Sequence, residues 1–169
     1  ELVADLSTGW NVQFEPNQVP LNFWHVVAAD ESFQNPFSAP AFDLMQREID
    51  PAGENDQRIH YHCRFMFSGK VGDAKLVIED SAILGDWKLF VNEIPIENWE
   101  RQRVFDCANK VADISYAIKG GSTPTLNSIT IETSGPGRGL KEVLYLCGAF
   151  TCEYRYSHPS FPFLKGSNS

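Results

Sequence analysis

The sequence predicts an all-β fold, an antiparallel β-sandwich. Short segments alternate hydrophobic and polar residues, as strands with one solvated face do. Turn-forming residues separate these segments, and a helical period is scarce. The chain of 169 residues is long enough for one domain that buries roughly two thirds of its unfolded surface. We therefore expect a sandwich of about eight strands joined by turns and short helical turns.

The expected strands follow one another along the chain. Alternation is first seen at 10–15, and it is clearest at 58–67, where five apolar residues face away from His60, His62, Arg64 and Met66. Further strands are expected at 74–79, 87–92, 103–106, 126–133, 142–150 and 151–156, with Gly85-Asp86 as the turn before 87–92. Residues 143–147 are apolar on both faces, which predicts a central strand.

Helical signals are short. One candidate helix covers 42–48. A second candidate is a single turn at 113–118, where Asp113 is suited to cap the first N–H groups and Gly120-Gly121 end the turn. Both are too short to change the predicted fold class.

Residues 1–164 are expected to form a single domain, and the polar residues 165–169 a linker or tail. Because the chain begins with Glu1, we expect it to be one module of a longer protein. Residues 28–56 lose the strand period and hold seven acidic residues, Asp30, Glu31, Asp43, Glu48, Asp50, Glu54 and Asp56, against one basic residue, Arg47. This segment is interpreted either as a crossover that wraps over the sandwich or as a functional loop.

The charge of the chain argues against two classes of partner. The net charge is −8, and lysines and arginines do not cluster. Nucleic acids and anionic lipid surfaces are bound by basic patches. The expected partners therefore include neither nucleic acid nor membrane.

Four stretches of sequence resemble a known family: LVIE at 76–79, GDWKLFVN at 85–92, DI at 113–114 before two glycines, and NSITIE at 127–132. In this order they are similar to the sugar-binding jelly-roll domains of family 2-type and rhamnosidase-like glycoside hydrolases, which share the galactose-binding-like fold. The family usually turns with Asn-Gly where this chain has Asn92-Glu93, so we expect a longer or different turn here. The resemblance implies an accessory domain attached to a catalytic domain of the same chain.

A candidate carbohydrate site lies at 98–103, which we expect to be a loop. Sugars stack on aromatic faces and share hydroxyl hydrogen bonds with planar polar side chains. Trp99 is the expected platform, with Arg101 and Glu100 as hydroxyl partners. The competing interpretation is that Trp99 plugs one end of the sandwich while the arginines pair with nearby acids.

Three other residues are weaker candidates for sugar binding. His60 and His62 share a strand face that either carries a ligand or is simply solvated or covered by 28–56. Trp24 offers a second aromatic surface or pins its segment to the core. Trp10 and Trp87 are expected in the core.

The sequence gives little support for a metal site or for disulfide bonds. Asp50, Glu54 and Asp56 are calcium candidates, but their spacing is not that of an EF-hand, and no cofactor is expected. His60 and His62 lack a third ligand at a telling spacing. The four cysteines, Cys63, Cys107, Cys147 and Cys152, form no zinc pattern, and their even number permits two disulfides without requiring them.

The sequence holds no nucleophile elbow, phosphate-binding loop or zinc-protease motif. Carboxylate pairs abound in a chain with 22 acidic residues and are uninformative. The expected function is a non-catalytic carbohydrate-binding or accessory domain of a larger glycoside hydrolase, with polysaccharide or oligosaccharide as ligand. The alternative is a purely structural sandwich that supports a catalytic module, and a stand-alone enzyme is the third hypothesis.

Overall fold

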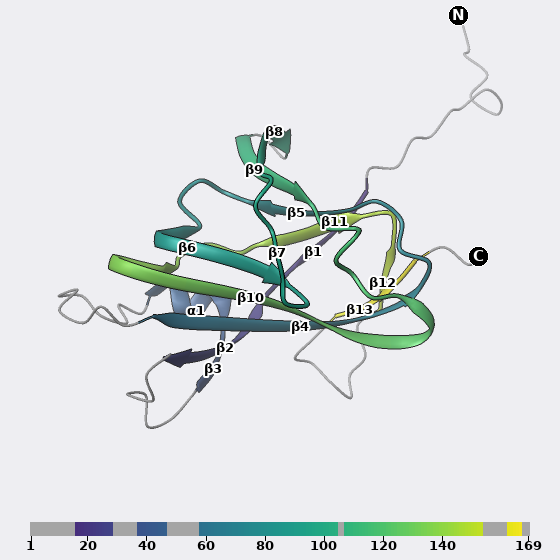
Figure 1. Cartoon of the computed structure of the whole chain (residues 1–169), viewed down its shortest axis with the longest axis horizontal. Helices are drawn as coiled ribbons and strands as arrows, with labels where there is room; N and C mark the ends of the chain where they lie inside the picture. Colours follow the sequence, from purple (N-terminus) through teal and green to yellow (C-terminus); the bar gives the residue numbers. More distant parts are fainter. Residues whose placement is uncertain (1–15, 29–36, 47–57, 105–106, 154–161, 167–169) are drawn as a thin grey trace, which may run out of the picture.

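The computed structural model describes residues 16–28, 37–46, 58–104, 107–153 and 162–166. Within them the chain forms thirteen strands and one short helix. The strands build two sheets, so the predicted all-β sandwich is confirmed. Figure 1 shows the two layers, with β4, β10 and β6 in one and β5, β11 and β1 in the other.

The smaller sheet has five strands in the order β1 (Asn17–Pro20), β11 (Tyr145–Gly148), β5 (Ala74–Ile78), β9 (Cys107–Asp113) and β8 (Glu100–Val104). All its neighbouring strands are antiparallel. β11 lies between β1 and β5, which confirms the central strand predicted from the doubly apolar run. Its outer face carries Cys147, which packs in a small cluster with Val77 and Val111.

The larger sheet has eight strands, of which six follow the order β12 (Thr151–Glu153), β13 (Phe163–Lys165), β4 (Ile59–Gly69), β10 (Gly121–Leu140), β6 (Ile83–Val91) and β7 (Ile94–Pro95). The first half of β4 also pairs with β2 (Phe23–Ala28), and β2 pairs with β3 (Phe37–Pro40). β13 runs parallel to the second half of β4 and extends one residue into the expected tail.

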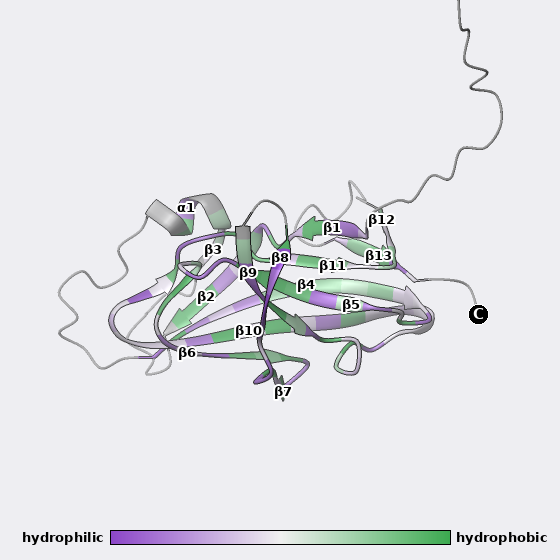
Figure 2. Cartoon of the chain, turned by 90° about the horizontal axis from the view of Figure 1, so that it is seen from above, coloured by the Kyte–Doolittle hydropathy of each residue, from purple (hydrophilic) through white to green (hydrophobic). Residues whose placement is uncertain are grey.

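The core lies between the two sheets, and β4 shows why the sequence folds this way. Its odd-numbered residues from Ile59 to Phe67 are buried, whereas Arg64 is exposed and His60, His62 and Met66 are half-buried. A strand places successive side chains on opposite faces, so the alternation read from the sequence becomes an inner and an outer face. Apolar and polar bands alternate along the long strands in Figure 2.

The turn expected at Gly85-Asp86 is wrong, because both residues lie inside β6. The chain turns earlier, where the Ala82 N–H donates to the Glu79 carbonyl at 3.0 Å. Gly85 has φ +81° and lies beside a register shift between Ser134 and Gly139 of β10. The extra residues of this irregularity belong to β10, which approaches Gly85 so closely that a Cβ would lie 2.3 Å from the Ser134 carbonyl oxygen. The close approach and the positive φ together explain a glycine in the middle of a strand.

The turn after β6 also differs from the expectation. Asn92 and Glu93 both have positive φ, 49° and 70°, and Val91 pairs directly with Ile94. This is the tight two-residue hairpin that Asn-Gly normally forms, although the second residue is glutamate. Asn92 is held in place because the Ser128 N–H donates to its Oδ1 at 3.0 Å and its Nδ2 donates to the Ala117 carbonyl at 2.8 Å.

Replacing Glu93 with glycine should raise the free energy of unfolding by about 1 kcal/mol, because a left-handed conformation costs a residue with a Cβ roughly 1–2 kcal/mol. Urea unfolding of both proteins measures the difference. Glu79→Gly is the matched control, since Glu79 lacks positive φ and gains nothing from glycine. An unchanged or lower stability of Glu93→Gly would contradict the explanation.

The remaining elements match the expectations in part. Helix α1 (Ala41–Gln46) covers much of the predicted 42–48, and its Ala41 and Leu44 are buried in the core. Asp113 accepts hydrogen bonds from the backbone N–H and hydroxyl of Ser115 at 2.9 and 2.7 Å, as the predicted cap requires. These bonds lower the pKa of the Asp113 carboxyl. The strand at 10–15 and most of the 28–56 segment lie outside the described residues.

Candidate functional site

A groove runs along the edge of β6 next to the short strand β7. Its volume is about 410 Å³, within the usual range of small-ligand sites. Within the part of the chain that the structure describes, β7 pairs only with Phe90 and Val91, which leaves the preceding part of this edge without a partner strand. The groove is lined by Trp87, Lys88, Leu89, Phe90, Pro95, Ile96, Glu97 and Trp99.

Two half-buried indoles line this groove. The rings of Trp87 and Trp99 meet edge to face, with centroids 5.6 Å apart and an interplanar angle of 79°. The Trp99 Nε1–H donates to the Ile96 carbonyl at 3.0 Å, which fixes the orientation of its ring. Both side chains pack against the hydrophobic core on one side. The structure thus holds an ordered aromatic pair at an open groove.

The hairpin brings the two indoles together. In the register set by Val91 opposite Ile94, Trp87 lies opposite Asn98, and Trp99 is one residue further along the chain. The Ile96 N–H donates to the Leu89 carbonyl at 2.9 Å, so the chain continues beside β6 after β7 ends. Trp87 shares the inward-facing parity of Leu89 and Val91 but lies nearer the open part of the edge.

A small cluster of charged groups lies beside Trp87. The Lys110 Nζ lies 5.4 Å from the centroid of the Trp87 ring, a cation–π contact. Asp80 pairs with Arg101 at 2.6 Å and lies 3.8 Å from the Lys110 Nζ. Because the Arg101 side chain is 64% exposed, this ion pair adds little to stability. The ion pair does, however, occupy the Arg101 guanidinium with the carboxylate of Asp80.

The structure therefore separates the residues that the sequence grouped around Trp99. Glu100 and Arg101 begin β8 instead of lying in a loop, and neither lines the groove. Glu100 accepts a hydrogen bond from Gln102 at 3.1 Å. Trp99 lines the groove and also packs on Trp87, so it combines features of the platform and of the plug.

Trp24 lies in the core, as the second interpretation of this residue had it. Its side chain is fully buried, and its Nε1–H donates to the Leu21 carbonyl at 2.8 Å. A ligand has no access to this ring. For Trp87 the expectation and the structure differ in the opposite sense: this residue was expected in the core, and it lines the groove.

Three histidines gather on the outer face of the larger sheet. His25 of β2 lies directly opposite His62 of β4, and the rings of His60 and His62 are 6.1 Å apart. His62 Nδ1 forms a hydrogen bond with Thr130 Oγ1 at 3.0 Å, and His25 Nδ1 bonds Ser38 Oγ at 2.9 Å. Burial, and then the charges of His60, His25 and Arg64, lower the pKa of His62, whereas Glu132 opposes this shift.

This shift predicts that acid destabilises the fold. The unfolded state binds a proton at His62 more readily than the folded state does, so stability falls as the pH decreases below about 6.5. The expected result is a lower free energy of unfolding at pH 5.5 than at pH 7.5. His62→Asn retains a hydrogen-bonding group for Thr130 and should reduce the slope. An equal slope in both proteins would exclude His62 as its source.

Among the residues that the structure describes, no group of three or more His, Cys, Asp or Glu side chains is arranged to hold a metal ion. The calcium candidates Asp50, Glu54 and Asp56 lie outside those residues. Cys63 and Cys147 are buried free thiols, and burial raises their pKa values to about 12 and about 11. Such thiols are protonated and unreactive at neutral pH.

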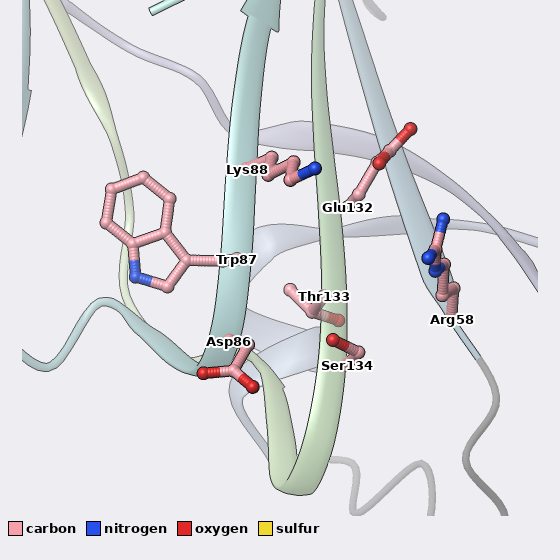
Figure 3. Close-up of a pocket in the computed structure, with 7 residues that line it drawn as sticks. All are labelled: Arg58, Asp86, Trp87, Lys88, Glu132, Thr133 and Ser134. Carbon is pink, nitrogen blue, oxygen red and sulfur yellow. The ribbon is translucent and has the colours of Figure 1, made fainter. Parts of the chain in front are cut away.

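A second, smaller hollow of about 110 Å³ lies beside Lys88. It is formed by β6, β10 and the residue before β4, and Figure 3 shows the side chains around it. Trp87 and Lys88 line both hollows. The other lining residues are Arg58, Asp86, Glu132, Thr133 and Ser134.

Sequence reasoning missed Lys88, Glu97 and the second hollow. In the sequence, Lys88 and Glu97 are charged residues that belong to no motif. Only the tight Asn92-Glu93 turn places them beside the indoles. The signal that identifies the pair is that Trp87 and Trp99 lie at nearly the same distance on either side of that turn. It becomes informative only when the turn is read as a two-residue one.

The fold is similar to that of part of several solved enzymes. A β-D-glucuronidase of Dictyoglomus thermophilum matches with a TM-score of 0.54 and 13% identity, over 86% of this chain and 32% of that chain. The apo β-glucuronidase of Ruminococcus gnavus matches with a TM-score of 0.56 and 13% identity, over 87% of this chain and 33% of that chain. The same enzyme bound to D-glucaro-d-lactam gives 0.55 and 14%, over 87% and 33%.

These likenesses establish the class of fold, a β-sandwich of the kind found in glycoside hydrolases. The chain spans about a third of the length of these enzymes. No family model and no curated protein sequence matches it. Within the described residues, no helix is both long and apolar enough to cross a membrane.

Proposed function

We propose that this chain is a non-catalytic accessory domain of a larger glycoside hydrolase and that it binds glycan through the groove of Trp87 and Trp99. Two observations support the first part: the fold is similar to a portion of glycoside hydrolases, and the likeness covers about a third of their chains. The indole pair in the open groove carries the second part. The partners are a polysaccharide or oligosaccharide and a catalytic domain in the same chain.

The groove offers the two kinds of contact that sugars require. The indole rings present apolar surface to the C–H face of a pyranose ring, and their packing keeps that surface in place without a ligand. Glu97 accepts hydrogen bonds from hydroxyl groups, and Lys88 donates to them. These two residues replace Glu100 and Arg101 as the proposed hydroxyl partners.

Calorimetric titration of the chain with a panel of soluble polysaccharides tests this proposal. Trp99→Ala and Trp87→Ala should each weaken binding about five- to thirtyfold, because an aromatic contact at such a site contributes on the order of 1–2 kcal/mol. Arg101→Ala is the matched control and should leave the affinity unchanged. Circular dichroism establishes that each variant is folded.

Two results of this titration would contradict the proposal. One is the absence of binding by the wild type across the panel. The other is an affinity that depends on Arg101 and not on Trp99, which would restore the site first expected from the sequence. Retained affinity in both tryptophan variants would remove the groove as the binding site.

A purely structural role is the second candidate, and the packing of Trp99 favours it. The indole N–H is already satisfied by Ile96, and the ring edge contacts Trp87, as in a plug that closes one end of a core. The arginine–acid pair expected with the plug is also present as Arg101 and Asp80. A loss of stability in Trp99→Ala, with no glycan binding by the wild type, would select this function.

A further inference from the structure

Four charged side chains of both signs line the smaller hollow. Arg58, Lys88, Asp86 and Glu132 surround it, and within the described residues none of them forms an ion pair. Lys88 pairs in register with Glu132, and Asp86 with Ser134, so the charged groups lie on adjacent strands of one outer face. In Figure 3, Lys88 lies between Trp87 and Glu132, with Arg58 on the far side of β10.

The composition of this rim favours a neutral polyhydroxylated ligand. Two cationic donors and two anionic acceptors balance, so an anion meets Asp86 and Glu132, and a cation meets Arg58 and Lys88. A sugar hydroxyl donates one hydrogen bond and accepts others, so adjacent hydroxyl groups match adjacent acceptors and donors. The hydroxyl group of Ser134 extends the polar floor, whereas Thr133 is buried and its hydroxyl bonds to the Ile59 carbonyl.

The position of the hollow connects it to the groove. Lys88 and Trp87 line both, so the two hollows adjoin across a single stretch of β6. From Asp86 to Phe90 the strand advances by roughly 13 Å at about 3.3 Å per residue. That distance exceeds one sugar ring, so a ligand that reaches both hollows has more than one sugar unit.

We propose that the smaller hollow is a second subsite and that the ligand is a neutral oligosaccharide or polysaccharide lying across β6. This inference rests on the proposed function and adds the ligand class. The aromatic groove holds one unit against Trp87 and Trp99. The next units hydrogen-bond to Lys88, Glu132 and Arg58.

A length series tests the inference separately from the proposed function. The probes are the neutral glycan that binds best in the panel, as monosaccharide, disaccharide, tetrasaccharide and hexasaccharide. Wild-type affinity should rise about tenfold from the shortest bound ligand to the longest, as expected for a few added hydrogen bonds. The double variant Arg58→Gln, Glu132→Gln should lose this gain and bind the short ligand as the wild type does.

Glu79→Gln, Arg103→Gln is the matched double control, because it removes one exposed acid and one exposed base outside both hollows. If no length binds, the proposed function fails together with the inference. If glycan binds with no dependence on length or on the double variant, the inference alone fails. Tighter binding of a uronate-containing or sulfated glycan than of the neutral one would overturn the assigned ligand class.

Discussion

Replacing Asn127 with alanine should lower the free energy of unfolding by about 3 kcal/mol, the first of the two largest effects that we expect. The side chain is 1% exposed, and all its hydrogen-bonding capacity is used. Its Oδ1 accepts from the Lys119 N–H at 2.7 Å and from Asn92 Nδ2 at 2.6 Å. Its Nδ2 donates to the carbonyls of Lys119 and Thr125 at 2.9 and 3.1 Å.

The cost is large because alanine leaves several polar groups without their partner. The same network holds the Asn92-Glu93 turn, on which the approach of Trp99 to Trp87 depends. Urea unfolding of wild type and variant measures the effect. Asn98→Ala removes an exposed asparagine and should change stability by less than about 0.5 kcal/mol. A loss below about 1 kcal/mol in Asn127→Ala would mean that water replaces the side chain.

Replacing Gly85 with alanine should lower the free energy of unfolding by a similar amount, about 3 kcal/mol. A Cβ at this position lies 2.3 Å from the Ser134 carbonyl oxygen, and φ is +81°. Neither the strand nor β10 accommodates that atom without moving. For a domain of this size the melting temperature should drop by about 10 °C.

Gly137→Ala is the control for this substitution. Gly137 also has positive φ, 65°, but a Cβ there meets nothing within 4 Å. It should therefore show the cost of the backbone conformation without the clash, about 1 kcal/mol. Equal losses in the two variants would show that the clash is relieved at no cost. Because Asp86 and Trp87 directly follow Gly85 in β6, Gly85→Ala should also weaken glycan binding.

Much of the fold follows from local sequence patterns. Three such patterns agree with the structure: the alternation in β4, the doubly apolar run that includes β11, and the cap at Asp113. Each depends only on which face of a strand is buried or on how a turn begins, and local sequence determines both. Gly85-Asp86 shows the limit of such patterns. A glycine signals an unusual conformation, but that conformation occurs in turns and also inside a strand where another strand approaches closely, and the pairing with β10 decides between them.

The site was harder to predict from the sequence, because it depends on which residues meet across strands. Trp99 was identified as a platform candidate, but its neighbours in sequence, Glu100 and Arg101, enter β8 and contact other groups. The residues that line the groove beside Trp99 come from β6 and the hairpin. Tryptophan burial was equally difficult to predict: Trp24 and Trp87 both lie in strands of the larger sheet, yet Trp24 is fully buried and Trp87 is half-buried at an open edge.

The most direct test of glycan binding at the indole pair is a titration followed by the indole N–H resonances of the ¹⁵N-labelled chain. The ligand is a neutral hexasaccharide from the panel. We predict that the Trp87 and Trp99 signals shift with saturation, whereas the signal of the buried Trp24 stays in place. Unmoved Trp87 and Trp99 signals at saturating concentrations of every glycan in the panel would contradict the account.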